Sequence, residues 1–343
     1  MSCTLYISWL GRAALGATVV VAGVLVAGCG DERSGEAPGA RLPQSGVRDS
    51  TGIMIAENPR PGADSRLGWA VGAEPLVSIG TAGGESAFQL HRVADATRLA
   101  DGRIVVANGG SLELLVFDAE GRHLDSWGGE GEGPGEFQEL NRVRPWRGDS
   151  LIAADPRQGR VSIFDSRGRH GRTIALLAES EGEVLIATGT EEAPGSIASA
   201  FGPDLLIGVL PDGTLFTRDD DFATTGFSRQ DHAYALKSTD GEEAVSLGKH
   251  PGPQTYTENF RAGGGFMFVP LRHPFGQTTH TGVWGDLAVL GPTERYELRG
   301  FRSDGSLARM VRRDFEPGTP TRAEQEAYFR RLVASYSEEG GPG

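Results

Sequence analysis

Lysine and net positive charge are scarce in this chain. Lys237 and Lys249 are its only lysines, so nearly all of the positive charge comes from arginine. The sequence has 33 Lys+Arg against 46 Asp+Glu, which gives a formal charge of −13 at pH 7. Duplex DNA and RNA are bound by basic surfaces that neutralise phosphates. The charge balance therefore predicts no nucleic-acid partner.

Sequence signatures of common catalytic sites are also missing. The chain has no HExxH, no G-x-S-x-G and no zinc-ligand spacing. Its glycine-rich segment Gly128 to Gly135 is unsuited to phosphate, because Glu130 and Glu132 lie inside it and would repel an anion. The sequence therefore predicts an architecture and a location, but it shows no reactive constellation.

Cysteine is limited to Cys3 and Cys29, and the second follows an apolar run. The 16 residues from Ala13 to Gly28 are small or apolar, and Arg12 is the only charged residue before them. This N-terminus resembles a bacterial lipoprotein signal peptide, with Val26-Ala27-Gly28-Cys29 as its lipobox. The resemblance implies that residues 1–28 are removed and that Cys29 is lipidated. The alternative is an uncleaved N-terminal membrane helix, and both readings tether the protein to a membrane.

The lipoprotein reading has two consequences. Cleavage removes Cys3 and modifies Cys29, so no thiol remains for a disulfide, a metal site or a nucleophile. Gly30, rather than Asp, follows Cys29, and this favours the outer membrane. We therefore expect a lipid-anchored protein on the periplasmic face of the cell envelope.

The rest of the chain divides by composition. Residues 29–64 are rich in Gly, Pro, Ser, Arg and acidic residues and are expected to form a flexible tether. Within them, Ile53 to Ala56 could add an edge strand to the outside of the following domain. Residues 65–315 are expected to form that domain, and residues 316–343 a C-terminal helix and tail. Thr321-Arg322-Ala323-Glu324 is a capping box ahead of that helix.

An internal repeat defines the domain. A shift of 47 positions carries Ile104 to Asn108 onto Leu151 to Asp155, and it carries Phe117 to His123 onto Phe164 to His170. Each unit reads as short strands separated by tight turns. A period in the forties with several short strands is typical of a β-propeller blade. Blade one is expected at about residues 89–128 and blade two at about 138–177.

Further units follow less regularly. Residues 179–203 read as an irregular insertion, strands resume at 204–217 and 234–237, and a last clear unit runs from Thr278 to Arg313. The segment Pro75 to Gly80 is expected to be the last strand of a blade completed at the C-terminal end. The length of the domain predicts an all-β, six-bladed β-propeller with a short C-terminal helix; five or seven blades remain alternatives.

The repeat also resembles a known family. Ile104-Val105-Val106-Ala107-Asn108, Val116 to Gly121 and the linker Gly131 to Phe137 resemble the NHL-like propeller repeat, and more narrowly the six-bladed propeller lipoproteins of bacteria. The resemblance covers about residues 75–177.

Residues that recur with the repeat are expected to serve every blade. Asp118 with Asp165, and His123 with His170, are therefore interpreted as scaffold. Asn108 and Asp155 close matching strands. In calcium-dependent propeller hydrolases of the lactonase type, such side chains converge on an ion in the central channel, and calcium prefers six to eight oxygen ligands. A hydrogen bond from each side chain to a turn is the favoured interpretation.

Four basic residues are candidates for ligand binding. Arg92 and Arg142 occur in similar contexts, where the innermost strand of each blade should begin, so that each could face the channel or pair with acidic loops. Arg272 and His280 lie in a segment outside the obvious repeat and could line the channel mouth. Because a positive channel in a negative protein attracts small anions, the expected ligand is anionic.

Two functions follow from these observations. The favoured one is a non-catalytic binding or scaffold lipoprotein without a cofactor, whose partner is a protein or a small anion. The alternative is a calcium-dependent lactone or ester hydrolase that uses the central channel, with Asn108 and Asp155 among its metal ligands.

Overall fold

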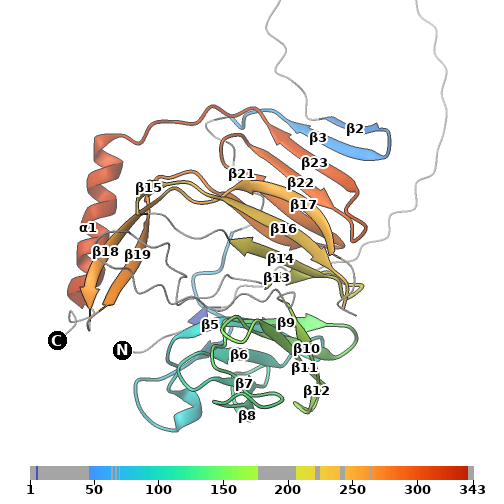
Figure 1. Ribbon diagram of the computed structural model, residues 1–343, viewed down its shortest axis with the longest axis vertical. Coiled ribbons are helices and arrows are strands. Elements are labelled where there is room, and N and C mark those ends of the chain that lie inside the picture. The colour runs from blue at the N-terminus through green and yellow to red at the C-terminus, as the bar shows by residue number, and fades with distance from the viewer. Residues whose placement is uncertain are drawn as a thin grey trace, which may run out of the picture.

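A computed structural model describes residues 5–6, 46–62, 65, 68, 70–176, 206–220, 225–239, 244–262 and 265–338. The described residues form strands, a short 3-10 helix at Ser86–Phe88 and a C-terminal α-helix (Figure 1). The all-β class with a short C-terminal helix is thus confirmed. Cys29 and the expected insertion at residues 179–203 lie outside the described residues.

Blades one and two have the expected boundaries. Each is a sheet of four antiparallel strands in sequence order. Blade one comprises β5 (Val93–Arg98), β6 (Ile104–Asn108), β7 (Glu113–Phe117) and β8 (His123–Gly128). Blade two comprises β9 (Arg142–Trp146), β10 (Ser150–Asp155), β11 (Arg160–Phe164) and β12 (His170–Ala175).

The later strands form two further four-stranded repeats and one smaller sheet. The third repeat comprises β13 (Leu206–Val209), β14 (Leu215–Asp220), β16 (Asp231–Lys237) and β17 (Ala244–Pro251). The last comprises β20 (Thr279–Trp284), β21 (Leu287–Pro292), β22 (Glu297–Phe301) and β23 (Leu307–Arg313). A three-stranded sheet holds β15 (Gly226–Ser228), β18 (Thr255–Ala262) and β19 (Gly265–Arg272).

The four-stranded repeats pack face to face in chain order. One buried cluster joins Val105 and Val116 of blade one to Val143 and Leu151 of blade two. A second cluster joins blade two to β13 and β14, and a third joins the third repeat to β21. Burying each such side chain contributes about 1.5–3 kcal/mol. This stacking of sheets is the arrangement of propeller blades, and the number of blades remains a prediction.

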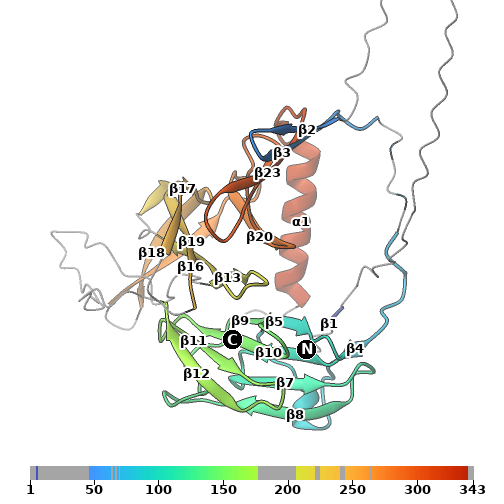
Figure 2. The ribbon, with the colours of Figure 1, turned by 90° about the vertical axis from the view of Figure 1, so that its right-hand side faces the viewer.

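The first strands of successive repeats lie next to one another. β5 lies against β9, β9 against β13, and β13 against β20. Figures 1 and 2 show β5–β12 together on one side of the molecule and the later strands on the other. The fold is therefore a β-propeller type whose innermost strands come from distant parts of the sequence.

Two recurring residues, a phenylalanine and a histidine, contact each other inside each of the first two blades. The rings of Phe117 and His123 meet edge to face at 5.6 Å between centroids, and those of Phe164 and His170 at 5.9 Å. Both phenylalanines are fully buried. The recurring histidines therefore pack against the core of their own blade, as the repeat predicted.

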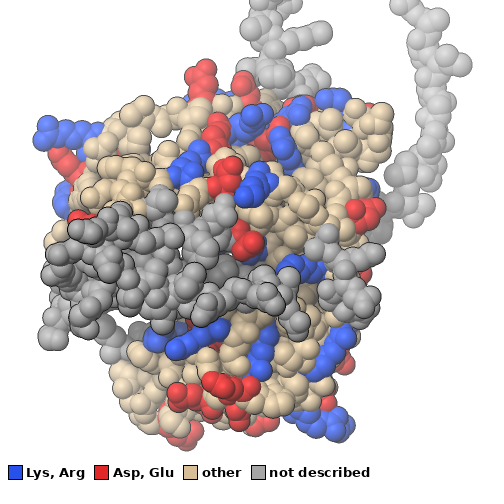
Figure 3. All heavy atoms as spheres, viewed as in Figure 1, with Lys and Arg blue, Asp and Glu red and all other residues tan. Residues whose placement is uncertain are grey.

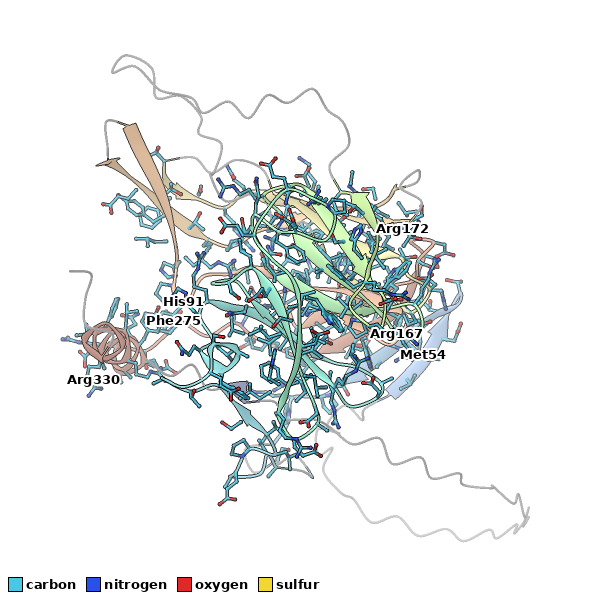
Figure 4. The ribbon with its side chains drawn as sticks, turned by 90° about the horizontal axis from the view of Figure 1, so that it is seen from below. Met54, His91, Arg167, Arg172, Phe275 and Arg330 are labelled. Carbon is cyan, nitrogen blue, oxygen red and sulfur yellow. The ribbon has the colours of Figure 1, made fainter. Side chains whose placement is uncertain are left out.

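The N-terminal strands join the last sheet. β3 (Ile53–Asn58) pairs in parallel with β23, and β2 (Gly46–Ser50) pairs with β3 at the outside of that sheet. The strand expected at Ile53 to Ala56 is confirmed, but the edge of the sheet is formed by β2 and not by β3. Figure 4 shows Met54 of β3 at one edge of the molecule and Arg330 of the helix at the opposite edge.

The segment before blade one does not join the C-terminal strands as expected. Its strand, β4 (Ser78–Ile79), pairs in this full-length chain with β1 (Leu5–Tyr6), which belongs to the residues that signal cleavage would remove. The physical reason is that β3 already occupies the free edge of β23. Ile79 is nevertheless buried in a cluster that covers the face of blade one opposite to blade two. β4 therefore covers blade one as the last strand of a preceding blade would.

Helix α1 (Arg322–Glu338) begins at the predicted capping box. The main-chain N–H of Thr321 donates to Glu324 Oε2 at 2.8 Å, and the N–H of Glu324 donates to Thr321 Oγ1 at 3.3 Å. Tyr328 contacts Phe275 with ring centroids 5.6 Å apart. In the part of the chain that the structure describes, no helix is long and apolar enough to span a bilayer.

A buried carboxylate joins the last two strands of the final repeat. Glu297 is 6% exposed, and its two oxygens pair with Arg299 at 2.6 Å and with Arg312 at 2.9 Å. Burial alone would raise the pKa of Glu297. The hydrogen bonds and charges of the two arginines outweigh burial and hold that pKa below its usual value.

Candidate functional site

Strand pairing at the start of β5 and β9 shows which residues of blades one and two correspond. Val93 lies opposite Asn108, and after a β-bulge Asp95 lies opposite Ala107. In blade two, Arg142 lies opposite Ala154, which is the repeat of Ala107. The counterpart of Arg142 is therefore Asp95, and Arg92 lies outside the strand. The equivalence between Arg92 and Arg142 that their similar contexts suggested is a false match, because the shift of 47 carries Asp95 onto Arg142 and Arg92 onto Glu139.

A cavity of about 360 Å³ lies among the innermost strands β9, β13 and β20. Arg142 and Arg144 contribute its charged groups, since alternate residues of a strand point to the same face. The remaining walls come from residues 207–209 of β13 and residues 281–283 of β20, which are aliphatic or small apart from Thr281. We call this space the channel cavity.

The width of the channel cavity depends on Gly208. A Cβ atom at this position would lie 2.6 Å from Val283 Cγ2, which is closer than real contacts allow. Only glycine therefore lets β13 and β20 approach each other at this point. Val283 itself is 39% exposed, so its side chain faces the cavity rather than a packed core.

The two arginines of the channel cavity have different environments. Arg144 forms an ion pair with Asp95, whose Oδ2 also accepts the main-chain N–H of Val143 at 3.0 Å. Arg142 Nε donates to the main-chain oxygen of Leu206 at 3.1 Å, which orients its guanidinium between β9 and β13. Two guanidiniums therefore line the cavity, and the carboxylate of Asp95 pairs with one of them.

The surface around it is mixed in charge. Figure 3 shows basic and acidic side chains interspersed over the face in view. The chain has a formal charge of −13, and the channel cavity is lined by two guanidiniums.

A second cavity, of about 380 Å³, lies between blades one and two. Arg92 lines it, together with residues of the β6–β7 turn and of the connection from β8 to β9. It shares no lining residue with the channel cavity. The two cavities are nevertheless close in the sequence, because Asn141 lines this second cavity and Arg142 lines the channel cavity. We call it the inter-blade cavity.

The four basic candidates are therefore not brought to one place. Arg142 lines the channel cavity and Arg92 the inter-blade cavity. Arg272 is exposed at the end of β19, opposite Thr255 of β18. His280 is exposed on β20, next to Thr281 of the channel cavity, but it lines neither cavity.

Asn108 and Asp155 form matching hydrogen bonds at the ends of β6 and β10. Asn108 Oδ1 accepts the N–H of His91 at 2.9 Å, and Asp155 Oδ2 accepts the N–H of Gln138, the repeat of His91, at 2.7 Å. Asp155 also accepts the N–H of Gln158 at 3.1 Å and its side-chain amide at 2.6 Å. Both side chains are buried. These are the end-of-strand hydrogen bonds that the sequence favoured.

The calcium hypothesis needs further oxygen ligands beside Asn108 and Asp155. Calcium sites in proteins gather six or more oxygens. Among the described residues, no group of three or more His, Cys, Asp or Glu side chains is placed to hold a metal ion. The oxygens of Asp155 accept protein N–H groups in the structure. Calcium binding at these two residues stays a prediction.

Sequence reasoning missed Arg144 and Gly208, which line the channel cavity, and Asp95, which pairs with Arg144. Arg144 could have been found, because it lies two residues after Arg142 and therefore on the same face of the strand. Asp95 could also have been found, because the shift of 47 carries it onto Arg142. Gly208 looked like an ordinary strand glycine, and only the approach of β20 gives it a role.

Comparisons with known proteins give distant similarities. No family model matches the chain, and no curated protein matches it in sequence. A candidate exported protein from Bacteroides fragilis is 11% identical with a TM-score of 0.38, over 68% of this chain and 54% of that one. A candidate 6-phosphogluconolactonase from Bacteroides uniformis is 14% identical with a TM-score of 0.34, over 66% of this chain and 57% of that one. Virginiamycin B lyase from Staphylococcus aureus is 9% identical with a TM-score of 0.29, over 66% of this chain and 70% of that one. The chain thus spans about half the length of the first of these proteins, and at such identities their activities say nothing about its own.

Proposed function

We propose that this protein is a non-catalytic, lipid-anchored binding protein of the cell envelope that holds a small anionic ligand in the channel cavity. The observation that carries the proposal is the pair Arg142 and Arg144, set among aliphatic and main-chain walls. Binding sites for small molecules are typically concave and mostly apolar, with a few placed polar groups. The channel cavity is concave and holds two guanidiniums among its aliphatic and main-chain walls, and its exposed lining is more polar than apolar.

Arg142 is the group proposed to meet the ligand. Its Nε is held by the oxygen of Leu206, which leaves the guanidinium oriented from β9 toward β13. Arg144 is held by Asp95 and supports the positive potential from the same face. A planar guanidinium suits carboxylates and phosphates because it can donate two parallel hydrogen bonds to them. The proposed ligand is therefore a small carboxylate or phosphate.

The proposed location rests on the sequence. The apolar run that ends in Val26-Ala27-Gly28-Cys29 supports lipidation at Cys29, and Gly30 supports the outer membrane. Replacing Cys29 with Ala is expected to release the protein from the membrane fraction and to abolish acyl labelling. Unchanged fractionation with an intact N-terminus in mass spectrometry would instead identify a membrane helix.

Ligand binding is tested with Arg142→Gln. The purified full chain is titrated by calorimetry with phosphate, sulfate, citrate and short-chain carboxylates. Because a hydrogen bond to a charged group contributes about 1.5–3 kcal/mol, the variant should bind the best anion roughly 10- to 100-fold more weakly. Arg169→Gln is the matched control, because Arg169 lies in an exposed turn of the same blade. Equal affinities in wild type and Arg142→Gln would refute the channel site.

The alternative function, a calcium-dependent lactone or ester hydrolase, has its own test. Calcium at about 100 times its dissociation constant should stabilise the fold by about 2.7 kcal/mol. An increase in melting temperature that is lost in Asp155→Asn would support calcium at Asn108 and Asp155. No change in melting temperature would leave the anion-binding proposal as the better account.

A further inference from the structure

The inter-blade cavity has an unusual backbone. Arg92 and Leu112 both line it, and they have φ angles of 53° and 57°. Thr51, in the turn between β2 and β3, is the other non-glycine residue with a positive φ in the described part of the chain. A non-glycine residue in this left-handed conformation costs about 1–2 kcal/mol. Such strain persists only where the surroundings enforce it, and it is concentrated at functional sites.

Two glycines, Gly109 and Gly110, line the inter-blade cavity next to Arg92. A Cβ atom at Gly109 would lie 2.8 Å from the oxygen of Arg92, and one at Gly110 would lie 2.6 Å from His91 Nδ1. The N–H of Gly109 donates to the oxygen of Arg92 at 3.1 Å, and that of Gly110 to the oxygen of His91 at 2.9 Å. The strand end is thus folded tightly beneath Arg92, and side chains larger than hydrogen would break it.

This backbone recurs only in part in blade two. The shift of 47 carries Leu112 onto Gly159, which has a φ of 59°, so the left-handed turn at Leu112 is common to both blades and serves the scaffold. Glu139 takes the place of Arg92 and has no positive φ, and Pro156 and Arg157 take the places of Gly109 and Gly110. The left-handed Arg92 above two glycines is therefore particular to blade one.

The lining carries both signs of charge on different walls. Blade one supplies the guanidinium of Arg92, and the connection between the blades supplies the carboxylates of Glu130 and Glu139. Ser111, Gln138 and Asn141 add a hydroxyl and two carboxamides, and Leu140 is a buried apolar contact. Ser111 Oγ is held by Asn108 Nδ2 at 2.8 Å, which connects this wall to the end of β6.

This chemistry distinguishes between ligand classes. A phosphate or a dicarboxylate would meet two carboxylates, and a polyamine would meet Arg92. No aromatic ring lines the cavity to stack against a sugar. A zwitterion satisfies both walls, because its carboxylate pairs with the guanidinium and its ammonium with a carboxylate. A volume of about 380 Å³ lies within the range of small-molecule sites, roughly 300–1,000 Å³.

We propose that the inter-blade cavity binds a free α-amino acid, with Arg92 holding its carboxylate and Glu130 its ammonium group. This site is separate from the channel cavity and does not depend on the function proposed for it. The protein therefore presents two binding sites on either side of the start of β9, one for an anion and one for a zwitterion.

The test is calorimetric titration of the purified full chain with the twenty common amino acids, each at up to millimolar concentration. The best ligand is then compared with its N-acetyl derivative, its methyl ester and a dipeptide that contains it. Arg92→Gln and Glu130→Gln should each weaken binding about tenfold or more. Arg122→Gln and Glu120→Gln are the matched controls, because both residues lie in an exposed turn of the same blade and should leave binding unchanged.

The derivatives test the assignment without any variant. The acetylated form lacks the ammonium charge and the ester lacks the carboxylate charge, so both should bind at least about tenfold more weakly than the free amino acid. Equal binding of either derivative would overturn the proposal, as would the absence of binding by every amino acid. Binding of the dipeptide alone would also overturn it, since the ligand would then be a peptide. Arg142→Gln should leave amino-acid binding intact, which separates this result from the test of the channel cavity.

Discussion

The turn glycines of the blades allow a sharp test of how the sheets are stacked. Gly121 and Gly168 occupy the same turn position in blades one and two, with φ angles of 86° and 78°. Alanine at either position would adopt a left-handed backbone at a cost of about 1–2 kcal/mol. The two positions differ in the neighbouring atoms that a Cβ atom would contact.

A Cβ atom at Gly168 would lie much closer to its nearest neighbour than one at Gly121. A Cβ atom there would lie 2.2 Å from Trp127 Nε1, in the last strand of the preceding blade. At Gly121 it would lie 3.0 Å from Val77 Cγ1, which can shift by a few tenths of an ångström. Trp127 is buried, and its indole N–H donates to Asp125 at 2.8 Å, so the ring cannot move freely. Overpacking of this kind costs about 1–3 kcal/mol.

We therefore expect Gly121→Ala to lower the free energy of unfolding by about 1–2 kcal/mol, and Gly168→Ala by about 2–5 kcal/mol. Urea denaturation followed by circular dichroism measures both, provided that the m values of the variants agree. Combining Gly168→Ala with Trp127→Phe should recover part of the loss, because the smaller ring leaves room for the methyl group. Equal losses at the two glycines, or no recovery in the double variant, would refute the stacking of Trp127 on the next blade.

Two further predictions concern the channel and the buried ion pair. Gly208→Ala should cost about 1–3 kcal/mol of stability and should be largely rescued by Val283→Ala, as measured by a double-mutant cycle; independent effects would mean that β13 and β20 do not meet there. Glu297→Gln should cost about 1–3 kcal/mol at pH 7, because it leaves two arginines without their carboxylate. The lowered pKa of Glu297 means that its contribution is present above the ordinary carboxyl pKa of about 4.3 and is lost as the pH falls through the lowered value. The difference between wild type and Glu297→Gln should therefore shrink below about pH 4 in denaturation experiments, and a difference that grows there would contradict the ion pair.

Local patterns in the sequence were enough to predict several parts of this protein. The repeat of 47 residues placed the strands of blades one and two within a few residues of their observed bounds. Thr321 and Glu324 marked the start of α1, because a capping box is satisfied by residues only three positions apart. Asn108 and Asp155 were identified as end-of-strand residues for the same reason, since both close strands at matching positions of the repeat.

Tertiary structure decided which side chains share a site. The channel cavity joins Arg142 and Arg144 of β9 to Gly208 of β13 and Val283 of β20, which lie far apart in the sequence. The parallel pairing of β3 with β23 closes an edge that the sequence assigned to residues 75–80. Register and strand pairing depend on contacts between residues far apart in the chain, which one sequence does not display. For this reason the repeat predicted the blades, and only their packing separated the channel cavity from the inter-blade cavity.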